Sequence, residues 1–425
     1  MTTQSPSQGE SATLADPTLP AGIQPTSVAI NPAGTKAYVT NAGNNDPATS
    51  SVFVYDTTTF VQSAVTGILA GGSPRGVTVL PNGAFAYVAI PGGGFVQKIN
   101  TATDAVVATI SVGTTAFPFG VAPTPDSQFV YVSNLFGNQL RKISVASNSV
   151  VNNLSVGSSP SGVAVTPDNL FVWVANTFSN TVNKVSISAN SVVGTIPVGG
   201  APSGVAISPN GSFVWVSSTF ANTVTKIDAV TNAIVATIPV GNAPQGLAVS
   251  PDSSLVYVAN NGANTVSVIN AATNTVTSTL TVGANPLGVA VNASPSQVWV
   301  TNNNNDTVSV LTPSVTLATT LTASPAVINL NTTTGQFFIP LLSATLKETV
   351  SNNPVSGQTV TFTANTVVGP VPLGSAVTNG SGVASLTNVV VPPTVITATT
   401  YTAAFAGAPG FGPSSSTASL TFTGA

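Results

Sequence analysis

Charged side chains are scarce in this sequence, and cysteine and histidine are absent from it. Only 4% of the 425 residues are charged and the formal net charge is −3, whereas charged residues make up roughly 25% of an average soluble domain. Such a composition offers no basic surface, so we expect no nucleic-acid partner. Without cysteine there are no disulfides or thiolate ligands, and without histidine the commonest general base and metal ligand is missing. We therefore expect no metal site and no cofactor.

Long apolar runs are also missing, although 43% of the residues are hydrophobic. No run approaches the roughly 18 residues that a membrane helix needs. The longest, such as LFVWVA at 170–175, have the length of a strand, which predicts buried strands and no membrane span. The first residues show no basic segment followed by an apolar one, so we expect no signal peptide here and a poorly structured lead-in over residues 1–10.

The sequence repeats itself with a nearly constant period. A Pro-x-[Gly/Ser]-[Val/Leu] element recurs with prolines at Pro25, Pro74, Pro118, Pro160, Pro202, Pro244 and Pro286. The successive spacings are 49, 44, 42, 42, 42 and 42 residues, which is the length of a four-stranded propeller blade. In the unit from Pro244, four runs rich in β-branched residues (GLAVS, LVYVAN, TVSVIN and TVTSTLTV) alternate with turn residues. This pattern predicts an all-β, seven-bladed β-propeller over residues 1–313.

The seventh unit is one strand short, because only three strands are clear before Pro313. The missing strand is found near the N-terminus, where TLPAGIQP at 18–25 aligns with TIPVGNAP at 237–244. We therefore expect the N-terminal strand to pair with the last blade and to close the ring, since an open ring would leave unpaired strand edges.

Each unit carries one aromatic residue at the same point of its second strand. These residues are Tyr38, Tyr87, Tyr131, Trp173, Trp215, Tyr257 and Trp299. They could form a stacking platform for sugars or bases, but sevenfold recurrence within a strand favours rings that fill the space between blades. The surrounding segments, such as AYVTN at 37–41 and VWVTN at 298–302, resemble the YVTN repeat of bacterial and archaeal propellers over residues 18–312. The resemblance implies the fold and no single activity.

Residues 314–425 lack the 42-residue period but contain several short strand-like segments. The segment TNGSGVASL at 378–386 resembles bacterial immunoglobulin-like modules found in surface adhesins. We expect an immunoglobulin-like β-sandwich here. The segment VTLATTLT at 315–322 fits either the last blade or the first strand of this sandwich.

Most charged residues have a structural interpretation. Six aspartates occupy turns: Asp56, Asp104, Asp126, Asp168, Asp228 and Asp252, where an Asp side chain can accept hydrogen bonds from its own backbone. Four lysines share one position in the third strand of blades two to five: Lys98, Lys142, Lys184 and Lys226. They could form a stripe for anionic ligands, but we expect a solvated position that limits edge pairing.

Two features distinguish individual blades and are our candidates for ligand binding. Arg75 occupies the slot between Pro and Gly that leads into the innermost strand, so we expect it near the mouth of the central channel. Blades three to five carry Phe136, Phe178 and Phe220 in the turn after the second strand. We expect Phe119 to join this row; the rings then either form an exposed binding patch or pack between the loops.

Three functions fit these features. We favour a non-enzymatic extracellular or cell-surface protein, in which the propeller binds a protein or glycan and the immunoglobulin-like domain is a spacer or assembly unit. A structural subunit of a surface layer or filament, which self-assembles, is the first alternative. The second is a lactonase- or lyase-like propeller enzyme, but the histidines that such a resemblance would bring are missing.

Overall fold

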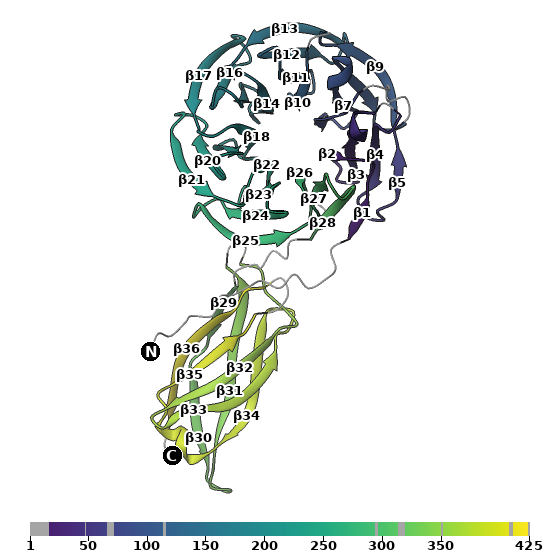
Figure 1. Cartoon of the computed structure of the whole chain (residues 1–425). Helices are drawn as coiled ribbons and strands as arrows, with labels where there is room; N and C mark the ends of the chain where they lie inside the picture. Colours follow the sequence, from purple (N-terminus) through teal and green to yellow (C-terminus); the bar gives the residue numbers. More distant parts are fainter. Residues whose placement is uncertain are drawn as a thin grey trace. The chain divides into compact units, whose positions relative to one another are not determined.

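The computed structural model (Figure 1) divides into two compact units, residues 1–313 and 314–425. The described residues are 17–46, 48–65, 72–113, 116–293, 296–312, 319–349, 352–407 and 411–423. The expected lead-in over residues 1–10 lies outside them. In the described part of the chain, no helix is long and apolar enough to cross a membrane.

The first unit consists of seven four-stranded antiparallel sheets arranged around a central axis (Figure 1), as predicted. The innermost strands are β2 (Pro25–Ile30), β6 (Val77–Val79), β10 (Pro118–Pro123), β14 (Pro160–Val165), β18 (Pro202–Ile207), β22 (Pro244–Val249) and β26 (Pro286–Asn292). The second strands are β3 (Lys36–Asn41), β7 (Phe85–Ile90), β11 (Phe129–Asn134), β15 (Phe171–Asn176), β19 (Phe213–Ser218), β23 (Leu255–Asn260) and β27 (Gln297–Asn302).

The outer half of each blade is built in the same order. The third strands are β4 (Ser51–Asp56), β8 (Phe95–Asn100), β12 (Gln139–Ser144), β16 (Thr181–Ser186), β20 (Thr223–Asp228), β24 (Thr265–Asn270) and β28 (Thr307–Leu311). The outermost strands are β5 (Gln62–Ala64), β9 (Ala105–Ser111), β13 (Ser149–Ser155), β17 (Ser191–Pro197), β21 (Ile234–Pro239), β25 (Thr275–Thr281) and β1 (Thr18–Pro20). Two short 3-10 segments, η1 (Gly43–Asn45) and η2 (Pro91–Gly93), follow the second strands of blades one and two.

Strand β1 completes the seventh blade, as predicted from its alignment with the other outer strands. It pairs antiparallel with β28, with Leu19 opposite Val308. The side chain of Leu19 is buried in a cluster that also contains Val308, Val310 and Trp299. The first strand of the ring and the last three therefore form one sheet, so the ring has no break between its two ends.

The seven repeated aromatic residues fill the spaces between blades, which confirms the structural interpretation. All seven are at most 3% exposed. Each ring belongs to a cluster with side chains of the following blade: Trp173 with Val214 and Val216, for example, and Trp299 with Tyr55 of the first blade. Burial of a large ring at each junction stabilises the contact between neighbouring blades.

The prediction that the four lysines are solvated is wrong. Lys98, Lys184 and Lys226 are at most 6% exposed, and Lys142 is partly buried. The Nζ of Lys184 donates to the Ala229 carbonyl (2.6 Å) of the next blade and lies 4.1 Å from the centre of the Phe171 ring. Lys98, Lys184 and Lys226 thus each join two neighbouring blades, whereas Lys142 lies over the Phe129 ring of its own blade. The face of the third strand that carries them is covered by the neighbouring blade, which the strand pattern alone does not reveal.

Five of the six aspartates accept hydrogen bonds within their own turns, as predicted. Asp228, for example, accepts from the backbone N–H groups of Val230 and Thr231. Asp104 differs, because it accepts from the Tyr38 hydroxyl (2.8 Å) and forms an ion pair with Lys36 (2.7 Å), both in the preceding blade. Its role is also structural, but it joins two blades.

We expect the stability of the ring to change little between about pH 5 and pH 8, because histidine is absent. Burial, reinforced by the charge of a nearby aspartate, raises the pKa of Tyr131 and of Tyr257 to about 12. The protonated hydroxyls make their full contribution to the stability of the fold below their unfolded pKa of about 10. This contribution is lost as the pH rises toward 12. Backbone hydrogen bonds lower the pKa of Asp56 and Asp228, so their contribution is lost as the pH falls below about 4.

This pH profile can be checked by thermal melts followed by tryptophan fluorescence, together with tyrosinate absorbance. Burial lowers the pKa of Lys98 and Lys226, so the fold gains a little stability as the pH rises toward the unfolded lysine pKa of about 10.4. This gain partly offsets the loss of stability that the tyrosines cause at high pH. Ionisation of all tyrosines near pH 10 in the folded protein would contradict the profile.

The second unit is also all-β. Its strands are β29 (Thr319–Ala323), β30 (Ala326–Asn331), β31 (Gln336–Glu348), β32 (Thr359–Thr366), β33 (Gly369–Val377), β34 (Val383–Val391), β35 (Thr400–Phe405) and β36 (Ser414–Phe422), with a 3-10 segment η3 (Pro393–Thr397). All strand pairs are antiparallel except β30 with β36. Residues 319–322 of the ambiguous segment belong to β29, which pairs with β31 of this unit.

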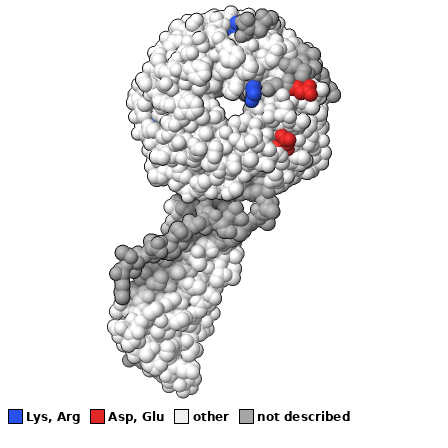
Figure 2. Space-filling model, viewed as in Figure 1, with Lys and Arg blue, Asp and Glu red and all other residues white. Residues whose placement is uncertain are grey.

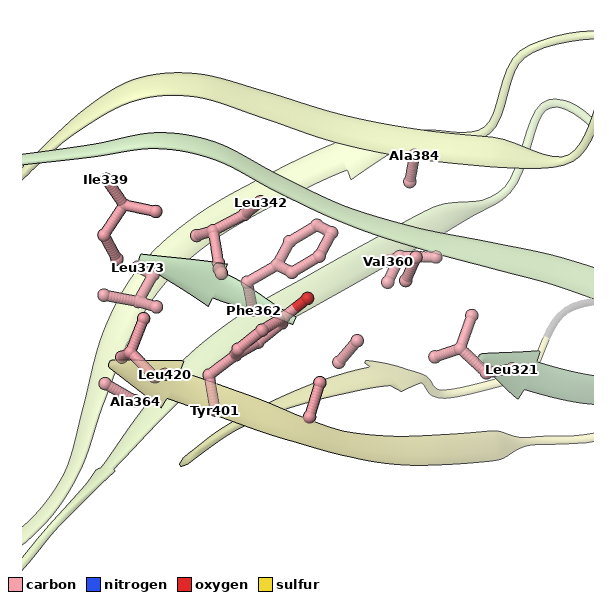
Figure 3. Close-up of a cluster of buried hydrophobic side chains, with 14 of the residues drawn as sticks. Leu321, Ile339, Leu342, Val360, Phe362, Ala364, Leu373, Ala384, Tyr401 and Leu420 are labelled. Atoms are coloured by element: carbon pink, nitrogen blue, oxygen red, sulfur yellow. The ribbon is translucent and has the colours of Figure 1, made fainter. Parts of the chain in front are cut away.

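A single apolar cluster forms the interior of the second unit. Figure 3 shows Leu342, Phe362 and Tyr401 pointing toward one another from different strands. The rings of Phe362 and Tyr401 lie 6.2 Å apart, and the buried Tyr401 hydroxyl donates to the carbonyl of Ser343 (3.0 Å). The unit therefore has a core of its own, built from side chains far apart in the sequence.

Candidate binding face and central cavity

Glycine in the Pro-x-Gly element allows the innermost strands to approach one another closely. A Cβ atom added to Gly120, Gly162 or Gly246 would lie 2.3–2.4 Å from a backbone carbonyl oxygen of the next blade. No side chain fits at such a distance. The repeated glycine is therefore explained by packing at the centre of the ring.

The innermost strands of all seven blades surround a central cavity of about 260 Å³. The slot between Pro and Gly supplies the side chains that differ from blade to blade: Thr26, Arg75, Phe119, Ser203, Gln245 and Leu287. Ser27, Leu247 and the glycines and valines at the adjoining positions form the rest of the wall. The repeat thus places one variable side chain from each of six blades on a nearly uniform wall, and these six side chains determine the chemistry of the cavity.

Arg75 is the only charged residue among the described residues that line this cavity. Its backbone is fixed, because its N–H donates to the Ala89 carbonyl (3.0 Å) and its carbonyl accepts from the Thr40 hydroxyl (2.7 Å). The Nε of its guanidinium is buried without a hydrogen-bond partner, and burial lowers its pKa. The structure therefore holds a positive charge in the cavity that no carboxylate of the described chain neutralises.

Two further polar residues of the cavity were not singled out by the sequence analysis. The Ser203 hydroxyl donates to the Gln245 side-chain oxygen (2.8 Å), and the Gln245 amide nitrogen donates to the Thr219 hydroxyl (3.3 Å). Their only signal in the sequence is their place in the slot that Arg75 also occupies. Because they bond to each other across two blades, they are oriented and present polar atoms to the cavity.

The loops that lead into each blade and the turns that follow each second strand lie on one face of the ring. Asn180 adopts a left-handed conformation (φ 56°), and its side-chain oxygen accepts from the N–H of Ala201 (2.8 Å) in the loop to the next blade. Asn138, Asn222, Asn264 and Asp306 make the equivalent contact in their blades. We call this side of the propeller the loop face.

Three exposed phenylalanines lie on the loop face of three adjacent blades. Phe136, Phe178 and Phe220 are 68%, 75% and 81% exposed, which favours the exposed patch over the alternative in which the rings pack between the loops. The Phe178 N–H donates to the Ser158 carbonyl (3.2 Å). The same bond is made at the equivalent positions Gly262 and Asn304, so the turn does not need an aromatic side chain.

The expectation that Phe119 extends this row is wrong. Phe119 lies in the wall of the cavity and is only partly exposed. The ring beside Phe136 is instead Phe117, at 4.9 Å between centroids. Phe117 and Phe119 are separated by one residue at the start of an inner strand, and which of them meets the loop depends on how that strand enters the ring.

Figure 2 shows a nearly uncharged surface around the ring, with a hollow at its centre. Two carboxylates of the loop face, Asp46 and Asp306, lie in blades one and seven and accept hydrogen bonds from the backbone N–H groups of Ala48 and Gln24. The exposed phenylalanines of blades three to five therefore lie on a different part of the ring from these two carboxylates. In the described part of the chain, no group of acidic residues could hold a metal ion.

The fold and its central cavity define the class of this protein, a seven-bladed β-propeller joined to a second all-β unit. Residues 164–252 match the model of a family described as YNCE-like beta-propeller. This match lies within blades four to six of the ring. No curated protein matches the sequence.

Solved structures share the fold at low sequence identity. A chain of the structure entitled "Kuenenia stuttgartiensis Hydrazine Synthase" is 18% identical with a TM-score of 0.61, covering 70% of this chain and 97% of that chain. A chain of "Crystal Structure of Mitotic Checkpoint Complex" is 15% identical with a TM-score of 0.63, covering 74% and 98%. At these identities the similarity concerns the fold alone.

Proposed function

We propose that the protein is a non-enzymatic extracellular or cell-surface protein whose propeller binds a protein or glycan through its loop face. The observation that carries the proposal is the exposure of Phe136, Phe178 and Phe220 on three adjacent blades. Exposed aromatic rings on neighbouring loops leave apolar surface in contact with water, which is unfavourable unless a partner covers it. Such patches are typical of interaction sites. The turn is built without an aromatic residue in blades six and seven, which supports a role beyond the fold.

We also propose that the propeller is of the YVTN type and that the second unit is an immunoglobulin-like spacer or assembly module. Strands β29, β31 and β34 pair with one another, as do β32, β33, β35 and β36. The strand β30 contacts both groups, and one apolar core lies within the unit. This arrangement is compatible with two facing sheets.

The proposal predicts that replacing Phe136, Phe178 and Phe220 together by serine weakens partner binding at least tenfold and leaves the melting temperature nearly unchanged. Losing three rings from an interface removes enough buried apolar area for such a loss. Binding is measured with a glycan array and with envelope proteins of the source cells. Failure of the wild-type protein to bind in both assays would refute the proposal, and unfolding of the triple variant would show that the rings are structural.

A matched control is available on the outside of the ring. Val107, Val151 and Val193 are 53%, 50% and 51% exposed at bulges of the outermost strands of blades two to four. Their replacement by serine removes exposed apolar surface without changing the loop face. We expect this variant to bind the partner as the wild type does.

The same valines favour a second candidate function, a subunit of a surface layer or filament. With Val235 (47% exposed) they form an apolar series on four consecutive blades, which suits side-by-side packing of rings. Negative-stain microscopy distinguishes the two functions. Ordered arrays that disappear in the valine variant would support the structural subunit, and dispersed particles would support the binding protein.

A further inference from the structure

We propose that the central cavity is a second binding site, separate from the exposed phenylalanines Phe136, Phe178 and Phe220 of the loop face. It binds a small organic monocarboxylate, whose carboxylate contacts the Arg75 guanidinium. The proposal rests on the geometry of the cavity and does not depend on the proposed function. Its elements are the uncompensated guanidinium, the neutral polar groups beside it and the apolar wall.

The Arg75 guanidinium is available to a ligand, because one of its donors has no partner and no carboxylate is among the described residues that line the cavity. The Arg75 Nε is buried without a partner, although buried polar groups are nearly always hydrogen-bonded. No acidic residue is among the described residues that line the cavity. A carboxylate can accept two parallel hydrogen bonds from a guanidinium, and this contact is strong where water is excluded.

The surroundings of Arg75 favour a single negative charge with a mainly apolar body. There is no second cation in the described lining, so a doubly charged group such as phosphate would remain half neutralised. Phe119 and Leu287 provide apolar surface, while Ser203 and Gln245 add hydrogen-bonding groups. The volume of about 260 Å³ admits a molecule the size of one aromatic or sugar ring.

Backbone rigidity also favours a preformed site. Both backbone polar groups of Arg75 are hydrogen-bonded, to Ala89 and Thr40, and the neighbouring Gly76 donates its N–H to the Phe119 carbonyl (3.0 Å) of the next blade. Fixing the backbone before binding reduces the entropy lost when the ligand is held. The site therefore requires only the side chain of Arg75 to adjust.

Ligand-observed NMR with benzoate tests the proposal, with benzamide as its neutral counterpart and inorganic phosphate as a competitor. We expect benzoate to bind, benzamide to bind at least tenfold more weakly, and Arg75→Gln to weaken benzoate binding by about tenfold or more. Arg141→Gln is the matched control, because Arg141 also has a buried, unpartnered Nε but does not line the cavity. This variant should bind benzoate as the wild type does.

Equal binding of benzoate and benzamide, an unchanged affinity in Arg75→Gln, or no benzoate binding would overturn the proposal. Displacement of benzoate by equimolar phosphate would overturn the preference for a monoanion. Should Arg75→Gln fail to fold, Arg75→Lys tests the same point, because it keeps the charge but not the paired donors and should bind benzoate more weakly. The triple phenylalanine variant should retain benzoate binding, which separates this site from the loop face.

Discussion

Removal of residues 1–22 should lower the melting temperature of the propeller by on the order of 10 °C. The deletion removes β1, exposes the edge of β28, and uncovers Val308 and Val310, which Leu19 now helps to bury. It also removes the Pro20 carbonyl, to which the buried Tyr55 hydroxyl donates (2.6 Å). An unpaired strand edge promotes aggregation as well. Tryptophan fluorescence measures the effect selectively, because Trp173, Trp215 and Trp299 all lie in the ring.

Two shorter changes serve as controls for this deletion. Removing residues 1–16 leaves β1 in place, and we expect the melting temperature to stay close to that of the full chain. Leu19→Ala removes part of the buried side chain without removing the strand, so an intermediate decrease is expected. An unchanged melt after removal of residues 1–22 would show that β1 does not close the ring.

Gly246→Ala should decrease the free energy of unfolding of the propeller by about 3 kcal/mol. The added methyl group would meet the Leu287 carbonyl oxygen at 2.3 Å, and this atom belongs to the backbone of the next blade. Neither strand can move away without loosening the centre of the ring, so the clash must be relieved by separating two blades. Denaturant unfolding followed by tryptophan fluorescence measures the change.

Gly137→Ala is the matched control for this substitution. A methyl group at Gly137 would have the Asn134 Cβ as its nearest neighbour, at 3.7 Å, an ordinary contact. We expect its effect on stability to be within about 0.5 kcal/mol. Equal stability of the Gly246 and Gly137 variants would contradict the explanation of the repeated glycine by close approach of the inner strands.

Much of the propeller could be predicted because its signals are local and repeated seven times. The aromatic residue of each second strand, for example Trp173, recurs at one register, and only a role common to all blades explains this. The closure by residues 18–20 was also predictable, because an outer strand keeps its sequence pattern wherever it lies in the chain. The lysine position was misread, since strand alternation separates two faces but does not say what covers each face.

In the candidate sites, too, the positions of the residues could be predicted from the sequence, but their contacts and exposure could not. Exposure of Phe178 could not be predicted from its loop position, and Phe117 was not distinguished from Phe119 as the neighbour of Phe136. Ser203 and Gln245 occupy the same slot as Arg75, yet their mutual hydrogen bond depends on two blades meeting. Contacts between blades depend on the curvature of the closed ring, which cannot be predicted from any single segment of the sequence.

The sequence by itself determined the all-β class, the number of blades and the closing strand, because backbone hydrogen bonding and alternating burial impose short periods on each segment. Only the tertiary structure decided that Thr26 and Leu287, 261 positions apart in the sequence, line one cavity with Arg75. It also decided that Lys184 is buried and Phe220 exposed. The physical reason is that burial and proximity arise when the ring closes and each blade is covered by its neighbours.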